Sequence, residues 1–204
     1  MRNKFGEVLY KLGSKDKEIY VVVADISPAS GMDKFRERFP DRFINVGVAE
    51  QTMIGLAAGL AMAGKKPFAY TIATFAAYRP FEMIRNDLCY QNLPVTVIGM
   101  GSGTVYSSLG GTHLSQEDIS VIRSIPNINV FSPIDADEFE EILKYCAFKS
   151  NKPNYIRIGK SGEKNLTQNS LEKWKFGKIR KILNGKNTCV LVHGKIAEIA
   201  FDVQ

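Results

Sequence analysis

Cysteine and histidine are scarce in this chain of 204 residues. The three cysteines, Cys89, Cys146 and Cys189, lie far apart, form no CxxC pair and cannot all pair with one another. These features argue against a disulfide-stabilised secreted domain. With only two histidines, His113 and His193, a His-rich metal site is not expected either.

Long apolar runs are also missing. The longest, from Ile54 to Ala63, is interrupted by two glycines and is far shorter than the roughly 20 residues that span a bilayer. Residues 1–20 place their apolar side chains at helical spacing and lack the continuous apolar stretch of a signal peptide. We therefore expect a cytoplasmic protein that does not contact membranes.

The net charge of +6 is concentrated in one segment. Between Lys149 and Lys186 lie eleven of the 27 Lys and Arg residues but only two of the 21 acids. Basic segments can bind nucleic acid, but this one holds a single Trp and no series of aromatic residues for stacking. We interpret residues 163–187 as a solvated basic linker, with no nucleic-acid partner.

Before this linker, segments rich in β-branched residues alternate with helical patterns, which predicts an α/β fold with three α/β/α layers and a mostly parallel sheet. This domain is expected to span residues 1–162. Helices are expected at the N-terminus, over 49–63 and over about 77–90. Two more are expected after capping patterns, formed by Ser115 with Asp118 and by Asp135 with Glu138. The expected strands are 18–27, 42–48, 66–75, 93–101, 127–133 and 154–159.

After the linker, "TCVLVHGKIAEIAFDVQ" predicts one strand, a glycine turn and the start of a helix over 188–204. One strand and part of a helix cannot bury a core alone. The tail is therefore expected either to pack on a partner or to be the start of an incomplete second domain.

A lone carboxylate, Glu50, stands in "FINVGVAEQTMIGLAAGLAMAG", where a buried strand turns into a helix. It could simply complement the helix dipole, for about 0.3–1 kcal/mol. Its apolar surroundings favour a functional role as an alternative. The carboxyl edge of a parallel sheet is where ligands bind in such folds, and this edge would gather Asp25, Glu50, Phe75 and the loop that leads to His113.

Five motifs in order, "ADISPASG", the Glu50 segment, "TFAAYRPFEMIRND", "LGGTH" and "IPNINVFSPIDADE", span residues 25 to about 160. This run resembles the pyrimidine-binding domain of the transketolase and 1-deoxyxylulose-5-phosphate synthase family of thiamine diphosphate enzymes. The resemblance implies the thiamine diphosphate-binding fold. It also implies that Glu50 meets N1′ of the cofactor's aminopyrimidine, where a carboxyl group favours the imino tautomer that activates the cofactor.

The resemblance also implies roles for several aromatic and polar residues. Phe75 and Tyr78 become expected ring contacts and Phe81 a further candidate, although aromatics at helical spacing are usually core residues. His113 matches a loop histidine that reaches the donor substrate. Leu109 departs from the acidic residue of many relatives, so recognition of a sugar hydroxyl by that acid is not expected.

Asp25 and Ser27 match a turn near the cofactor at the subunit interface, but an ordinary turn at the end of a strand explains them equally well. Arg157 matches a strand-end arginine that binds a sugar phosphate in some relatives, and Arg79 is a second candidate for this role. Surface ion pairs are the alternative for both arginines.

The "GDG" motif that holds Mg²⁺ on the diphosphate in this family is missing from the chain. The resemblance therefore implies a split enzyme, in which a separate diphosphate-binding N-terminal subunit holds Mg²⁺ and shares thiamine diphosphate with this chain. An α2β2 assembly or a homodimer is expected. The 188–204 tail resembles the start of the family's third domain.

The implied activity is a transketolase that transfers a two-carbon ketol unit between sugar phosphates. A 1-deoxyxylulose-5-phosphate synthase-like reaction is one alternative. A 2-oxoacid dehydrogenase E1 β-type subunit is another, although its motif reads more like "PLSEQ" than "GVAEQ". A non-catalytic domain that binds a partner through its apolar face is the third.

Overall fold

The computed structural model describes residues 1–25, 31–168 and 170–202, and its centre is a six-stranded sheet in the order β2-β1-β3-β4-β6-β5. Every described pair of neighbouring strands is parallel, so the predicted α/β class is confirmed and the sheet is parallel throughout. The strands are β1 Ile19–Val23, β2 Phe43–Asn45, β3 Lys66–Ile72, β4 Thr96–Met100, β5 Asn129–Phe131 and β6 Asn154–Ile158.

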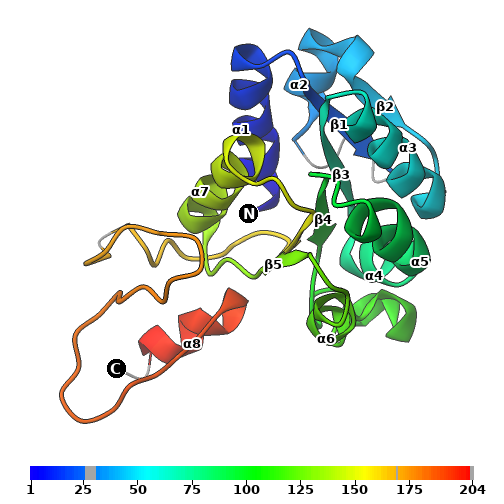
Figure 1. Cartoon of the computed structure of the whole chain (residues 1–204). Coiled ribbons are helices and arrows are strands. Elements are labelled where there is room, and N and C mark those ends of the chain that lie inside the picture. The colour runs from blue at the N-terminus through cyan, green and yellow to red at the C-terminus, as the bar shows by residue number, and fades with distance from the viewer. Residues whose placement is uncertain (26–30, 169, 203–204) are drawn as a thin grey trace.

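Helices cover both faces of the sheet, as Figure 1 shows, which confirms the predicted three layers. One face packs against α1 Arg2–Lys15, α2 Asp33–Arg38 and α7 Ala136–Phe148. The other packs against α3 Glu50–Met62, α4 Ala73–Ala77, α5 Phe81–Met83, a π-helix over Ile84–Tyr90, and α6 Asp118–Arg123. The last helix, α8 Ala197–Asp202, follows a 3₁₀ turn over Gly194–Ile196 and lies away from the sheet (Figure 1).

The apolar pattern of the sequence explains these layers. In α1, Phe5, Leu9 and Leu12 recur on one helix face, and all three are buried. All five residues of β4 are buried, as its continuous apolar run predicts for a strand covered on both faces. None of the helices among the described residues has the length and apolarity needed to cross a membrane.

The single helix predicted over 77–90 is wrong. The chain enters α4 immediately after β3, leaves it at Tyr78, and resumes as α5 and the π-helix. Pro80 lies at the break, where a proline has no N–H to donate and disfavours helical geometry in the residue before it.

The capping pattern at Ser115 is also wrong, whereas the one at Asp135 is confirmed. Helix α6 begins at Asp118 with no side-chain cap, and Ser115 instead exchanges backbone hydrogen bonds with Gly103. At the start of α7, the Glu138 N–H donates to Asp135 Oδ1 over 2.8 Å. The Glu138 carboxylate in turn accepts the Ile134 N–H over 2.8 Å.

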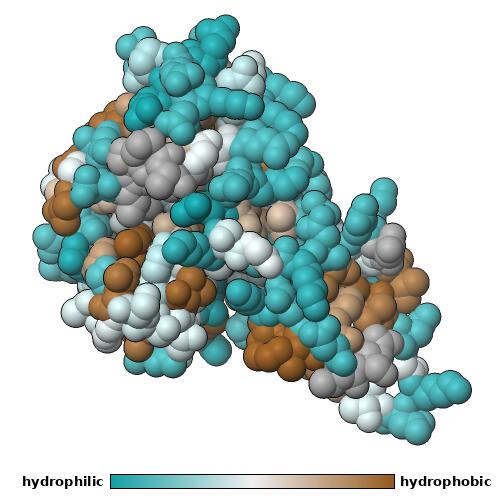
Figure 2. All heavy atoms as spheres, turned by 180° about the vertical axis from the view of Figure 1, so that it is seen from behind, coloured by the Kyte–Doolittle hydropathy of each residue, from teal (hydrophilic) through white to brown (hydrophobic). Residues whose placement is uncertain are grey.

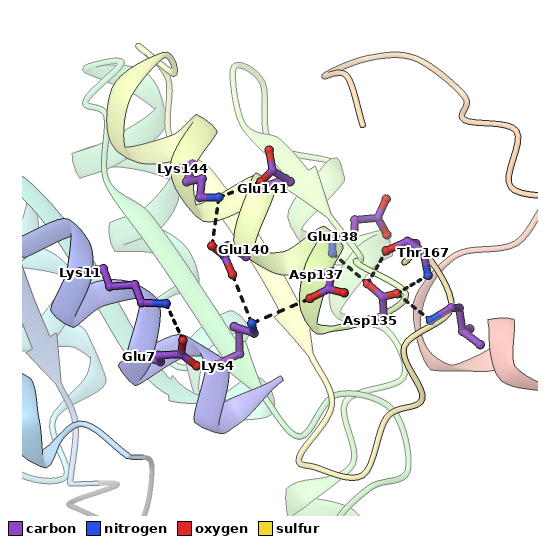
Figure 3. Close-up of polar contacts among 11 residues, drawn as sticks. Lys4, Glu7, Lys11, Asp135, Asp137, Glu138, Glu140, Glu141, Lys144 and Thr167 are labelled. Atoms are coloured by element: carbon purple, nitrogen blue, oxygen red, sulfur yellow. Dashed lines mark hydrogen bonds and ion pairs between the residues drawn. The ribbon is translucent and has the colours of Figure 1, made fainter. Parts of the chain in front are cut away.

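Asp135 also anchors the chain that follows β6. Its Oδ2 accepts the N–H groups of Leu166 and Thr167, and its Oδ1 accepts the Thr167 hydroxyl. Figure 3 shows this cluster, and beside it Lys4 of α1 between Asp137 and Glu140 of α7. Polar contacts thus fix both the start of α7 and its packing against α1.

The segment interpreted as a solvated linker is mostly exposed, but two of its aromatic residues pack on the domain. The Phe176 ring stacks on Tyr145 of α7 with ring centroids 4.6 Å apart, and Trp174 lies 5.7 Å from the same ring. Arg180 donates to Glu138 over 3.1 Å. The segment is therefore attached to α7 by specific contacts.

The strand predicted at the start of the 188–204 tail does not form, because residues 188–193 pair with no strand of the sheet. Val190 and Leu191 are instead 65% and 72% exposed. Gly194, at φ 67°, makes the predicted turn, and α8 follows. Figure 2 shows the C-terminal segment as a lobe beside the main body, with apolar side chains on its surface.

Candidate functional site

The candidate site lies at the carboxyl ends of the strands, with Glu50 at its centre. Glu50 is the first residue of α3 and is only 4% exposed. Both of its carboxylate oxygens accept from Arg79 Nη1, each over 3.0 Å. A buried carboxylate thus meets the guanidinium group at the rim of a cavity of about 220 Å³, which is lined by Val48, Ala49, Glu50, Gln51 and Arg79.

Asn45, at the end of β2, holds the two turns beside this carboxylate. Its Oδ1 accepts the N–H of Gly47, which has φ 71°, and the N–H of Asp25, which has φ 53°. Sequence reasoning missed Asn45, although an Asn before a glycine turn is a usable signal. Asp25 is exposed in this turn, and Ser27, the other residue of the motif, lies outside the described residues.

Arg79, Phe75 and His113 continue from Glu50 in a row. The Arg79 guanidinium carbon lies 3.9 Å from the centroid of the Phe75 ring. The His113 ring meets Phe75 edge to face, with centroids 5.1 Å apart. Arg79 therefore links Glu50 to Phe75, and Phe75 in turn contacts His113, so that the flat face of Phe75 carries a cation.

Tyr78 and Phe81 have other neighbours. Both are partly buried and pack against the apolar cluster that includes Ile54 and Leu88. The Tyr78 hydroxyl donates to Glu117 over 2.9 Å, and burial together with this bond raises the pKa of Tyr78 to about 12. Tyr78 is therefore a neutral hydrogen-bond donor at physiological pH.

Arg157 of β6 forms the ion pair that the sequence analysis left open. Its Nε donates to Asp118 over 3.0 Å, and its terminal nitrogen donates to the Ser115 carbonyl oxygen over 3.2 Å. Asp118 is fully buried and also accepts the Tyr155 hydroxyl over 2.8 Å. Sequence reasoning took Asp118 for part of a helix cap and missed this pair.

The same arginine lines a second cavity, of about 520 Å³, between the ends of β4 to β6 and the C-terminal segment. His193 and Lys195 also line it, and His193 Nδ1 lies 3.1 Å from the Ser132 hydroxyl. The orientation of Arg157 is set by its bonds to Asp118 and Ser115.

Residues 1–163 match the family model described as transketolase, pyrimidine binding domain. The chain belongs to this family. The resemblance described from the sequence motifs is thus confirmed. Membership of the family implies dependence on thiamine diphosphate.

Two curated relatives show the range of proteins in which this domain occurs. The chain is 37% identical over 196 residues to 1-deoxy-D-xylulose-5-phosphate synthase of Clostridium perfringens, covering 96% of this chain and 31% of the synthase. It is 31% identical over 200 residues to a subunit of the apulose-4-phosphate transketolase of Phocaeicola vulgatus, covering 98% of this chain and 64% of that subunit. The chain thus spans less than two thirds of either relative.

A solved structure of a split-gene transketolase, described as an inactive β4 tetramer, matches with a TM-score of 0.73 and 41% identity. The match covers 81% of this chain and 52% of that one. A solved transketolase of Campylobacter jejuni shares the fold at lower identity, with 22% identity and a TM-score of 0.74 over 84% of this chain and 27% of that one.

The residues of the site suit one half of the family's cofactor. An aminopyrimidine ring needs a carboxyl group at its edge and an apolar ring on its face, and Glu50 and Phe75 offer these groups to one planar group, the guanidinium of Arg79. Arg79, a flat cation that both residues already contact, shows that a planar group with hydrogen-bond donors fits between them. Among residues 1–25, 31–168 and 170–202, no cluster of three or more His, Cys, Asp or Glu residues could hold the metal of a diphosphate.

Proposed function

We propose that this chain is the pyrimidine-binding subunit of a split thiamine diphosphate-dependent transketolase, which transfers a two-carbon ketol unit between sugar phosphates. The observation that carries the proposal is the buried Glu50 carboxylate at the start of α3, which Arg79 links to the face of Phe75. When bound, the cofactor supplies the electron sink for carbon–carbon bond cleavage and formation.

In this proposal each residue of the chain has a defined task. Glu50 holds the proton at N1′ of the aminopyrimidine, and Phe75 stacks on the ring and excludes water from that bond. Tyr78, Phe81 and Asp25 are proposed to border the ring.

His113 is proposed to contact oxygen atoms of the donor sugar, because its partly exposed ring lies against Phe75. Arg157 is a proposed phosphate ligand, with Asp118 fixing its guanidinium group. Arg79 is the second candidate for binding the phosphate, although in the structure it pairs with Glu50.

The partner in this proposal is a separate subunit that binds the diphosphate and its Mg²⁺. Two findings support it: relatives of this chain are named as transketolase subunits, and the β4 assembly of the split-gene transketolase is described as inactive. A cytoplasmic α2β2 complex is the form that we propose, with residues 163–187 as a linker to a third domain that begins near residue 188.

The test is to mix the chain with a candidate diphosphate-binding subunit, thiamine diphosphate and Mg²⁺, and to measure ketol transfer between sugar phosphates. We expect activity only in the complete mixture. Glu50→Gln should lower kcat by about 100-fold or more, because loss of a positioned proton-transfer group typically costs 10²–10⁴-fold.

Glu37→Gln is the matched control, because this glutamate is exposed and belongs to α2, which packs on the other face of the sheet from α3. Circular dichroism should show both variants folded. An inactive wild-type mixture, or full activity in Glu50→Gln, would contradict the proposal and favour a non-catalytic domain that binds a partner.

A second candidate reaction is the synthase type, favoured by the 37% identity to 1-deoxy-D-xylulose-5-phosphate synthase. A synthase of this kind joins a 2-oxoacid donor to a sugar phosphate with loss of carbon dioxide, whereas a ketol transfer releases none. Supplying the same mixture with isotopically labelled pyruvate and measuring released carbon dioxide separates the two reactions.

A further inference from the structure

Arg79 contacts the two groups that the proposed function assigns to the cofactor ring. Its Nη1 donates to both oxygens of Glu50 over 3.0 Å, and its guanidinium carbon lies 3.9 Å from the centroid of Phe75. One flat cation therefore makes both the hydrogen bond to the carboxylate and the stacking contact with the ring.

These contacts match what an aminopyrimidine would make in the same place. A guanidinium group is planar, delocalised and rich in N–H donors, and it stacks on aromatic faces. An aminopyrimidine is also planar, also stacks, and donates to a carboxylate when its ring nitrogen is protonated. The face of Phe75 and the inner oxygens of Glu50 cannot serve both groups at once.

We propose that Arg79 occupies the place of the aminopyrimidine in the free subunit and leaves it when the cofactor binds. This inference rests on the proposed function of Glu50 and Phe75. Cofactor binding is then the exchange of one planar donor for another, and Arg79 lowers the apparent affinity of the site.

The position of Arg79 explains both its pairing with Glu50 in the free subunit and its ability to move away. A buried carboxylate without a counter-ion is strongly destabilising, so the free subunit needs a cation beside Glu50. The Arg79 side chain is nevertheless 46% exposed, and its residue lies in the break between α4 and α5, outside regular helix. The side chain can therefore rotate into solvent without unfolding a helix.

The experiment measures binding of free 4-amino-2-methylpyrimidine to the full chain by NMR titration, without any activity assay. We expect Arg79→Gln to bind this probe about 10-fold more tightly than the wild type. Arg85→Gln removes the same charge from an exposed arginine that donates to the neighbouring Asn86, and it should leave the affinity unchanged.

A chemical competition tests the same exchange from the other side. Methylguanidinium at millimolar, non-denaturing concentration should displace the probe from Arg79→Gln, where the site is open to it. It should have a much smaller effect on the wild type, whose own guanidinium group already fills the site.

Adding Glu50→Gln to each protein separates failure of this inference from failure of the proposed function. If the Glu50 change abolishes binding and Arg79→Gln binds the probe no more tightly than the wild type, the exchange is wrong and the role of Glu50 stands. Loss of detectable binding in Arg79→Gln at millimolar probe would also contradict the exchange. If the probe binds equally well without the Glu50 carboxylate, the proposed function loses its central residue, and the exchange fails with it.

Discussion

Two of the three cysteines are buried and one is exposed, which gives the thiols different reactivities. Burial raises the pKa of Cys89 to about 11 and that of Cys146 to about 12. At pH 8 a thiol of pKa 11 is only about 0.1% thiolate, the form that reacts. We expect Ellman's reagent to modify one thiol per chain rapidly at pH 8, at Cys189, and all three in denaturing urea.

The same pKa shifts make the fold sensitive to alkali. A pKa that is higher in the folded state than in the unfolded chain contributes stability that is complete below the unfolded value, near 8.5 for cysteine. That contribution is lost as the pH rises toward 11 and above.

Cys189→Ser is the control for the labelling with Ellman's reagent, since it should abolish the rapid phase. Rapid modification of two thiols would contradict the burial of Cys89 and Cys146.

At the scale of single residues, the sequence predicted a functional role where a charged side chain stands among apolar neighbours. Glu50 was identifiable because it is a lone acid between apolar segments. Its pairing with Arg79 could not be predicted, because the two residues are 29 positions apart and Arg79 lies in a break between α4 and α5 where one continuous helix was expected. Asp118 was misassigned for a similar reason, since its partner Arg157 is 39 positions away and only the local capping pattern was visible.

At the scale of elements, Asp135 does more than cap α7. It is fully buried and accepts from three N–H groups and one hydroxyl, which belong to Glu138, Leu166 and Thr167 (Figure 3). We expect Asp135→Ala to lower the free energy of unfolding by about 3 kcal/mol, more than the roughly 1 kcal/mol of an ordinary cap, because buried donors lose their acceptor.

Urea denaturation followed by circular dichroism measures this cost. Asp33→Ala is the matched control, because Asp33 is also an acid in a first helical turn but is half-exposed and pairs with the half-exposed Arg36 on its own helix. It should change stability by no more than about 0.5 kcal/mol. Equal effects of the two changes would mean that Asp135 does not anchor residues 166 and 167.

Elements were predictable where a segment's pattern and its neighbours in the fold agree. The six strands of the sheet were found because each is apolar and pairs with another strand. Residues 188–193 have an equally strong strand pattern, but no described strand lies alongside them. Strand formation needs a partner that a local pattern does not reveal, so the same reasoning succeeded inside the domain and failed in the tail.

At the scale of the whole molecule, the connection between the domain and the tail depends on aromatic contacts. Trp174, the only tryptophan of the chain, and Phe176 both pack on Tyr145 of α7. Aromatic pairs of this kind contribute about 0.5–1.5 kcal/mol each beyond the area that they bury. The lysines around these rings, Lys173, Lys175 and Lys178, are exposed, so the two rings and the Arg180–Glu138 pair hold the segment to the domain.

Replacing Tyr145 with Ala should therefore release the segment while the sheet stays folded. We expect the fluorescence of Trp174 to shift to longer wavelength as its ring enters water, and trypsin to cleave faster after Lys173, Lys175 and Lys178. Tyr90→Ala, which removes a ring that is 88% exposed, should change neither signal. An unshifted emission in Tyr145→Ala would mean that Trp174 is held by Phe131, whose ring centroid lies 6.5 Å away, or by the chain around it. In that case α7 does not determine the path of the segment that leads to the tail.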